Sequence, residues 1–411
     1  MTKETYTQHI QELSLNLVQT EIDSVRKKDI LKTGVRVYDE GKIGIAGAIG
    51  EGEQDVLLQR ATDALKLDVP YPYPISTGRV ERVTPAHDLP EGQAFVHEME
   101  EMLGELRKAQ PGFSFSNKIA LATQDVRLAN DQGLDLQYGT TSIEVGLLIK
   151  DKNSSNILDA FVQYEGWQYD RAEFLRLCNM ICDAYHRRVD IQEGTYPVLF
   201  MADDPTYRTK LIESLHGLLY GTGGSLFSGK RGEQLFADTF TVYQSKNERD
   251  AFIGPFFDME GTVNDDYRFT LIENGVLVSP MTDKRYAAKF DLPLTGAAGG
   301  EYDSVPSLVT GGTRIASTGQ TIQELLDGRQ GILVWVAMGG DFTSDGHFAT
   351  PVQLAYLFDG ERLVGRLPEL NLSSHLYDMF GPDFIGVSTD SLTTLTKLNL
   401  AAMNMHVTKI S

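Results

Sequence analysis

Residues 211–236 have the sequence LIESLHGLLYGTGGSLFSGKRGEQLF, in which a helical pattern passes into a glycine-rich one. Leucines recur at helical spacing before the glycines, which predicts an amphipathic helix over about 206–220. The stretch also contains one histidine inside this helix and three glycines that end it: His216, Gly221, Gly223 and Gly224. A helix that ends in glycines can place a side chain at the edge of a cleft. A phosphate site, a metal site and plain packing all remain open.

The composition is that of a soluble globular protein of two or three domains. The 411 residues can bury a large core, and the hydrophobic (41%) and charged (23%) fractions are ordinary. The formal net charge of −20 disfavours direct contact with nucleic acid, because an acidic surface repels phosphates. No apolar run approaches the roughly 20 residues of a membrane helix, no secretory signal is recognisable, and two cysteines give no disulfide framework. We therefore expect a cytoplasmic protein with no membrane partner.

The N-terminal part of the chain predicts an α/β unit over residues 1–78. Apolar spacing predicts helices at about 3–20 and 53–67, and alternation predicts a hairpin of strands within 30–50. Three prolines and a glycine in 69–78 break both helix and strand, so we place a boundary there.

Residues 79–205 predict a central helix–sheet unit, and residues 206–411 a unit that opens with the helix of 206–220. The expected elements of the central unit are helices at 91–109 and 170–191 and strands at 113–128, 134–150, 157–166 and 196–202. Beyond about 234, short β-like runs dominate, and Asn274-Gly275 and Asp359-Gly360 are strong hairpin signals. The predicted fold class is α+β, with an N-terminal α/β part that carries helices on an antiparallel sheet and a β-rich C-terminal domain.

Two local patterns that resemble functional sites are better explained by packing. Residues 224–231 nearly match the phosphate loop G-x-x-x-x-G-K-[ST], but a helix precedes them and Arg231 replaces the hydroxyl that binds magnesium. Cys178 and Cys182 lie four apart on a predicted helix among apolar neighbours, which favours a buried helix face over a zinc site.

The histidines give no metal motif by themselves. His97-Glu98 begins like the H-E-x-x-H of metalloproteases, but Glu101 stands where the second histidine belongs, so we expect a solvated helix face. His216 is the one histidine followed directly by a glycine-rich segment. A packed, hydrogen-bonded imidazole is the ordinary alternative for such a residue.

Several blocks, in the same order, resemble the TldD/PmbA family of two-subunit peptidases, whose members are also labelled modulators of DNA gyrase. The blocks are GVRVYDEGKIGIAGAIG (34–50), GGSLFSGKRGEQLFADTFTV (223–242), FDMEGTVNDDYRFTLIENGVLVSPMTDKRY (257–286), TGGTRIAS (310–317), GGDFTSDGHFATPV (339–352) and LPELNLSSHLYDMF (367–380). Several blocks in order are a more specific signal than any single motif. The end of the chain, 391–411, departs from the usual terminal strand of the family.

In that family the TldD-type subunit holds a catalytic metal on a helix that bears H-E-x-x-x-H, with a cysteine ligand near the C-terminus. The second histidine of this motif falls on His216, whereas the first falls on Leu211 and the catalytic glutamate on Ile212. Glu213 is one residue out of register, about 100° around a helix. Residues 381–411 contain no cysteine. The resemblance therefore implies the PmbA (TldE) type of subunit, without catalytic or metal-binding residues of its own.

This resemblance implies a non-catalytic subunit that pairs with a TldD-like catalytic subunit and acts on peptides in maturation and proteolysis. Zinc is expected in the partner and no cofactor in this chain. The residues that we expect along the substrate path are His216, Gly221, Gly223 and Gly224. The alternative, that the glycines merely let the helix stop and turn, stays open.

Two other functions stay open as well. One is a self-contained homodimeric metallopeptidase whose ligands are not recognised, with His347 and His375 as candidates. The other is a peptide-binding scaffold that has lost hydrolysis. A homodimer of the isolated chain stays open as well.

Overall fold

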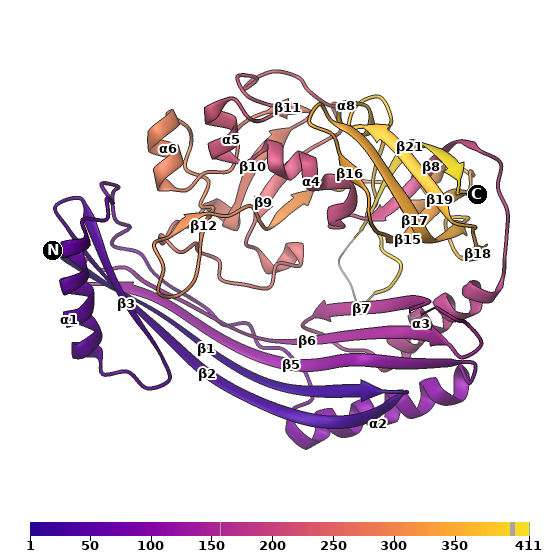
Figure 1. Cartoon of the computed structure of the whole chain (residues 1–411), viewed down its shortest axis with the longest axis horizontal. Helices are drawn as coiled ribbons and strands as arrows, with labels where there is room; N and C mark the ends of the chain where they lie inside the picture. The colour runs from indigo at the N-terminus through magenta and orange to yellow at the C-terminus, as the bar shows by residue number, and fades with distance from the viewer. Residues whose placement is uncertain (157, 395–398, 411) are drawn as a thin grey trace.

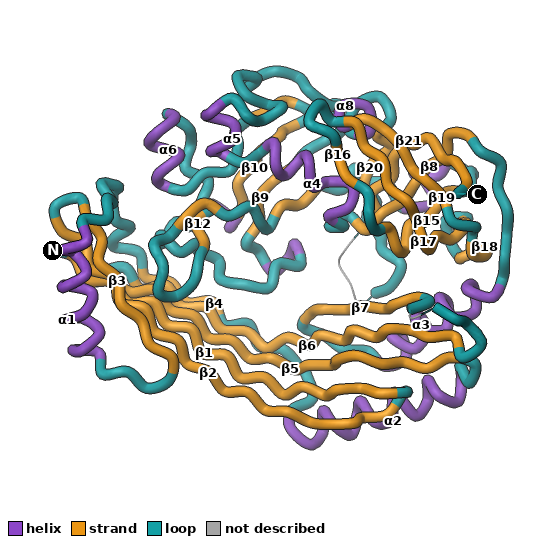
Figure 2. Tube along the Cα trace, in the orientation of Figure 1, coloured by secondary structure: helices purple, strands orange, loops and turns teal. Residues whose placement is uncertain are grey.

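The computed structural model describes residues 1–156, 158–394 and 399–410 (Figure 1). A long, curved and mainly antiparallel sheet forms the N-terminal part, and a strand-rich part formed by the C-terminal half lies over it (Figures 1 and 2). The chain crosses from one part to the other after α3. This mixture of helices and mainly antiparallel sheets confirms the predicted α+β class.

The N-terminal sheet has seven strands in the order β3-β2-β1-β5-β6-β4, and β7 also pairs with β6. The strands are β1 (Thr2–Val18), β2 (Glu21–Asp39), β3 (Lys42–Ile49), β4 (Val80–Val83), β5 (Phe113–Asn130), β6 (Asp135–Asp151) and β7 (Ala160–Gly166). The helices are α1 (Gln54–Ala64), the short η1 (Leu65–Leu67), α2 (Gly92–Ala109) and α3 (Arg171–His186). The predicted helices at 53–67 and 91–109 and the predicted hairpin within 30–50 are confirmed. The helix predicted over 170–191 ends earlier, at His186.

The predicted helix over 3–20 is wrong, because this segment is strand β1. It pairs along nearly its whole length with β2 on one side and β5 on the other. Leu15 and Leu17 are buried at the period of two that a strand requires. The apolar residues also fit a helical spacing, and pairing with two distant strands decides between the two patterns.

The strand-rich part is built on a closed ring. Strands β15, β8, β21, β19 and β17 are neighbours in that order, and β15 pairs back with β17. The strands of this sheet are β8 (Gly194–Met201), β15 (Gly331–Ala337), β16 (Asp341–Phe342), β17 (His347–Phe358), β18 (Leu363–Arg366), β19 (Leu370–His375), β20 (Phe384–Val387) and β21 (Leu400–Lys409). The C-terminal end, expected to depart from a terminal strand, thus supplies β21; residues 395–398 and 411 of that segment lie outside the described residues.

Two smaller sheets adjoin this ring. Their strands are β9 (Val242–Ser245), β10 (Arg268–Glu273), β11 (Val276–Leu277) and β14 (Thr313–Ile315) in one sheet and β12 (Ala298–Gly299) and β13 (Ser307–Leu308) in the other. The helices of this part are α4 (Pro205–Ser214), α5 (Gly217–Thr222), η2 (Glu248–Asp250), η3 (Asp265–Tyr267), α6 (Lys284–Phe290), α7 (Ile322–Leu326) and α8 (Leu376–Met379). Asn274-Gly275 joins β10 to β11 with φ of 49° and 79°, as a two-residue hairpin turn requires. The turn predicted at Asp359-Gly360 lies in the longer connection, 359–362, between β17 and β18.

The sheets do not divide where we placed the domain limits. Strands of 1–78 and of 79–205 share the N-terminal sheet, and β8, which precedes 206, belongs to the ring. The largest buried core contains residues of both parts, among them Leu15, Phe115, Leu333 and Tyr356. Sheets and a core that cross these limits do not by themselves define domains, so the limits at 78 and 205 stay predictions. None of the helices that the structure describes is long and apolar enough to cross a bilayer.

Candidate functional site

The helix predicted over 206–220 is two helices, α4 and α5, with His216 at the corner between them. The break arises because the backbone here pairs with a distant segment. Met281 N donates to the carbonyl of Leu215 (2.7 Å), and Gly217 N donates to the carbonyl of Met281 (3.0 Å). A Cβ on Gly217 would lie 2.5 Å from that carbonyl oxygen, so only glycine allows the contact. His216 therefore caps α5. The prediction that it lies inside a single helix is wrong.

The hydrogen bond that His216 makes decides what its ring can do. Leu218 N donates to Nδ1 of His216 (3.2 Å), so Nδ1 carries no proton. Burial lowers the pKa of His216, which favours the neutral ring with its proton on Nε2. A metal-binding histidine usually donates from one nitrogen to an acceptor and binds the metal with the other, bare nitrogen. His216 shows the opposite arrangement.

The motif positions beside His216 are aliphatic and packed. Leu211 is 2% exposed, and Ile212 packs against the core of the strand-rich part. Glu213 points to solvent and pairs with Lys210 at 2.8 Å. No side chain at these three positions can take the place of the missing histidine and glutamate.

The glycines after α5 have separate structural reasons. A Cβ on Gly221 would lie 2.3 Å from the ring of Phe290 in α6, and Gly223 ends α5 with φ of 83°. Gly224 has neither constraint, since its nearest atom would be Leu219 Cδ2 at 3.6 Å. These observations support the role of Gly221 and Gly223 in ending and packing the helix. All three glycines are exposed, and their place on a substrate path stays a prediction.

The donor sets of the described residues do not fit zinc. Among residues 1–156, 158–394 and 399–410, no three His, Cys, Asp or Glu side chains gather as a metal site requires. Cys178 and Cys182 are free and buried in the core, where burial raises the pKa of the Cys182 thiol to about 12. His97 lies on the surface and pairs with Glu101 at 3.2 Å. The readings of these residues as packed or solvated helix faces agree with this geometry.

The alternative ligands His347 and His375 do lie together. They are cross-strand neighbours on β17 and β19, with ring centroids 4.8 Å apart. Nδ1 of His347 lies 3.2 Å from a carboxylate oxygen of Asp345, whereas Nε2 of His375 contacts the Asp345 carbonyl at 3.0 Å. The Asp345 carboxylate thus contacts the ring of His347, and the Asp345 backbone carbonyl contacts the ring of His375.

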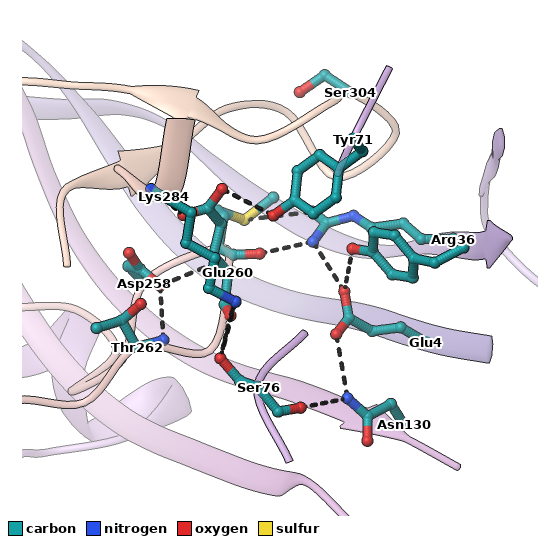
Figure 3. Close-up of polar contacts among 12 residues, drawn as sticks. Glu4, Arg36, Tyr71, Ser76, Asn130, Asp258, Glu260, Thr262, Lys284 and Ser304 are labelled. Atoms are coloured by element: carbon teal, nitrogen blue, oxygen red, sulfur yellow. Dashed lines mark hydrogen bonds and ion pairs between the residues drawn. The ribbon is translucent and has the colours of Figure 1, made fainter. Parts of the chain in front are cut away.

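Sequence reasoning missed a buried polar cluster around the D-x-E-G-T block (Figure 3). The carboxylate of Asp258 accepts backbone hydrogen bonds from Glu260 (2.9 Å), Thr262 (2.8 Å) and Ala298 (3.1 Å). Glu260 in turn accepts from the hydroxyl of Tyr71 (2.8 Å). Asp258 therefore shapes the loop, and Glu260 joins it to the N-terminal part.

A buried ion pair continues this cluster into the N-terminal sheet. Arg36 of β2 donates to Glu4 of β1 (3.2 Å) and to the carbonyl of Met259 (2.6 Å), and both charged side chains are at most 2% exposed. Lys284 Nζ donates to Ser76 (3.0 Å) on the other side of the loop. The D-x-E-G-T block and the strand block that contains Arg36 were both visible in the sequence, but their contact across 223 residues was not.

Burial controls the charges of this cluster. It raises the pKa of Glu260 to about 7, and the neighbouring negative charge of Asp258 adds to the effect. It lowers the pKa of Lys284. The cluster is therefore sensitive to pH near neutrality.

Comparison with known proteins agrees with the resemblance. The family model of the PmbA/TldA metallopeptidase C-terminal domain matches residues 193–408, which is more than half of the chain. A metalloprotease of Methanocaldococcus jannaschii is 29% identical over 157 residues, and the match covers 38% of this chain but only 34% of that relative. An uncharacterized protein of the same organism is 23% identical over 386 residues, covering 86% of this chain and 84% of its own length.

Solved structures share the whole fold. TldE from Thermococcus kodakarensis superposes with a TM-score of 0.79 at 16% identity, covering 100% of this chain and 96% of its own. A protein of Thermotoga maritima described as a modulator of DNA gyrase gives a TM-score of 0.77 at 14% identity, covering 99% and 96%. At these identities the likeness shows the fold alone.

Proposed function

The chain belongs to the TldD/PmbA metallopeptidase family, and we propose that it is a non-catalytic, TldE-like subunit of a TldD/TldE-type zinc metallopeptidase that acts in peptide maturation and proteolysis. Its partner would be a TldD-like subunit that bears H-E-x-x-x-H and holds the zinc. Zinc there would polarise the scissile carbonyl and activate water. This chain would contribute to the path of the peptide.

The observation that carries this proposal is the set of side chains at the H-E-x-x-x-H positions, which lie in α4 and at the corner before α5. Two of the three H-E-x-x-x-H positions are the aliphatic Leu211 and Ile212, and neither has a polar atom in its side chain. The third, His216, gives its Nδ1 lone pair to a backbone N–H. A set with so few free ligands cannot bind zinc and activate water by itself.

The remaining site residues suit a passive role. His216 is half-buried at the corner of α4 and α5, and Gly221, Gly223 and Gly224 lie exposed just beyond it. Small exposed residues let an extended peptide approach the backbone closely and form hydrogen bonds that tolerate many sequences. We propose that the peptide passes this corner on its way to the partner's zinc.

Reconstitution with a partner tests the function. The purified chain alone, a TldD-like homologue with H-E-x-x-x-H alone, and the two together are each assayed on an unstructured peptide, with zinc measured in each sample. We expect full hydrolysis only in the mixture, with zinc in the partner. A partner whose motif glutamate is replaced by glutamine is the matched control and should abolish activity. Zinc near one equivalent in this chain, with hydrolysis by it alone, would contradict the proposal and favour the self-contained peptidase.

A further inference from the structure

A second feature, away from His216 and the helices α4 and α5, has the size and the polar groups of a ligand site. A cavity of about 270 Å³ lies where the D-x-E-G-T loop, β9, β12 and the N-terminal strand β1 meet. This volume is close to the lower end of the roughly 300–1,000 Å³ of small-molecule pockets. The occupant must therefore be small, of about the size of one amino-acid residue.

One wall of the cavity carries a half-buried cation, Lys246, with unused hydrogen-bonding capacity. Lys246 follows β9, and its Nζ donates to the carbonyl of Gly296. In the part of the chain that the structure describes, this is the only acceptor that the ammonium meets, and no carboxylate lies within 4.0 Å of it. Since an ammonium has three donors, two remain for a ligand.

The acidic residue of the cavity wall forms no ion pair with Lys246 within 4.0 Å, although its negative charge favours the charged ammonium. Asp258 also lines the cavity, but its two oxygens accept three backbone N–H groups in the D-x-E-G-T loop. Those bonds hold the carboxylate in place, and among the described residues the ammonium has no acceptor besides the Gly296 carbonyl. A ligand carboxylate that reaches the two remaining donors would add charge-assisted hydrogen bonds.

A second polar group lies beside the cation. Gln244 lies in β9 and Lys246 directly follows this strand, and both residues line the cavity. Gln244 is 5% exposed, and among the described residues its Oε1 has no hydrogen-bond partner. An amide end with an unused acceptor can receive an N–H of a ligand.

Tyr6 and Ser245 also line the cavity, and the remainder of the wall is apolar or backbone. Phe252, Phe257 and Val309 line it, and Gly299 and Gly312 leave room at the sides. A Cβ on Gly312 would lie 2.6 Å from the carbonyl oxygen of Ser245, so a larger residue is excluded there. The cavity thus joins one cation and one amide to an apolar surface.

We propose that this cavity binds a small carboxylate with an apolar side chain and an adjoining N–H, namely the C-terminal residue of a peptide or a free apolar amino acid. The carboxylate would accept from Lys246 Nζ, the N–H would donate to Gln244 Oε1, and the side chain would pack on Phe252 and Val309. Phosphate groups fit less well, because they require more donors than one ammonium offers. The proposal does not depend on a zinc-bearing partner.

Calorimetric titration of the wild-type chain with three ligands tests the chemistry. The ligands are N-acetyl-leucine, N-acetyl-leucinamide, which lacks the carboxylate, and free leucine. We expect N-acetyl-leucine or leucine to bind at least ~10-fold more tightly than the amide, the range for losing a hydrogen bond to a charged group. Preference for N-acetyl-leucine identifies the C-terminus of a peptide as the source, and equal or better binding of leucine identifies the free amino acid. Absence of carboxylate binding, or equal binding of the amide, would overturn the proposal.

Variants locate the site. Lys246→Met and Gln244→Leu should each weaken binding of the preferred carboxylate, by ~10-fold or more for the first. Lys66→Met is the matched control, since Lys66 is 79% exposed and pairs only with a surface carboxylate. Thermal melts show which variants fold. If Lys246→Met does not fold, the comparison of N-acetyl-leucine with N-acetyl-leucinamide on the wild-type chain tests the proposal instead. Carboxylate binding that Lys246→Met leaves intact would overturn the site, whereas loss of partner-dependent hydrolysis in the wild type would overturn only the proposed function.

Discussion

Single residues in this chain are defined by their hydrogen bonds more than by their type. His216 was recognisable in the sequence as the remnant of a metal motif, but its neighbour Leu218 N fixes the tautomer and makes the ring a helix cap. Sequence spacing could place Leu211 and Ile212 on the motif, and the structure shows that both are packed. What spacing could not supply is the direction of a proton, which depends on backbone geometry.

Glu260 should make the stability of the protein fall as pH rises toward neutrality. Its pKa is about 7 in the folded state, against 4.5 as the ordinary value. Between these values the folded state holds more protons than the unfolded state, so the free energy of unfolding decreases as pH increases. The difference between these two pKa values limits the decrease in the free energy of unfolding to roughly 3 kcal/mol.

Glu260→Gln isolates this contribution. Glutamine can still accept from the backbone of Lys284 but cannot titrate. Denaturant unfolding should show that the free energy of unfolding decreases less from pH 5 to pH 8 in the variant than in the wild type. Equal losses in the two proteins would mean that Glu260 does not titrate in this range.

The buried ion pair of Arg36 and Glu4 should be far more sensitive than pairs on the surface. Arg36→Met removes the partner of a carboxylate that is 2% exposed, and a buried charge left unpaired costs about 3–5 kcal/mol. Arg127→Met is the control, since Arg127 is 53% exposed in its pair with Asp135 and should cost no more than about 1 kcal/mol. Urea unfolding of both variants measures the difference, and similar losses would show that burial gives the Arg36 pair no special weight.

At the scale of elements, local patterns predicted what local forces decide. The hairpin turns and the helices α1 and α2 follow from residues close together in the sequence. Strand β1 and the break between α4 and α5 do not, because the first depends on pairing with β5 and the second on Met281. Helical spacing of leucines cannot reveal a backbone contact with a segment more than sixty residues away.

Gly224 offers a test of the substrate path that separates function from stability. A Cβ added at Gly224 meets no atom closer than 3.6 Å and the position is exposed, so we expect the melting temperature of Gly224→Leu to change little. If a peptide passes this corner, the added side chain should reduce partner-dependent hydrolysis several-fold through KM. Gly104→Leu is the matched control, because it adds the same side chain to α2 with no atom within 4 Å of its Cβ. Unchanged kinetics in Gly224→Leu would remove Gly224 from the path and favour its role as a simple turn residue.

For the whole molecule, the sequence indicated an α/β beginning and a β-rich end, but not how they join. The join is long-range: one core shares Leu15 and Phe115 of the N-terminal sheet with Leu333 and Tyr356 of the ring. The cluster around Arg36 fixes a second point of contact. Neither the core nor the cluster has a periodic signal, since each assembles residues from distant segments.

The shared core and the cluster around Arg36 predict that the N-terminal sheet and the strand-rich part unfold together. If either part opened alone, it would expose its share of the common core and leave the charges of Arg36 and Glu4 without the Met259 contact. Hydrogen exchange followed by mass spectrometry in increasing denaturant should therefore show protection lost in β1 and in β8 at the same concentration. In Arg36→Met both transitions should move to lower denaturant together, because the same contact supports both parts. Loss of protection in β1 well before β8, in the wild type, would contradict the shared core and would make the N-terminal sheet an independent unit.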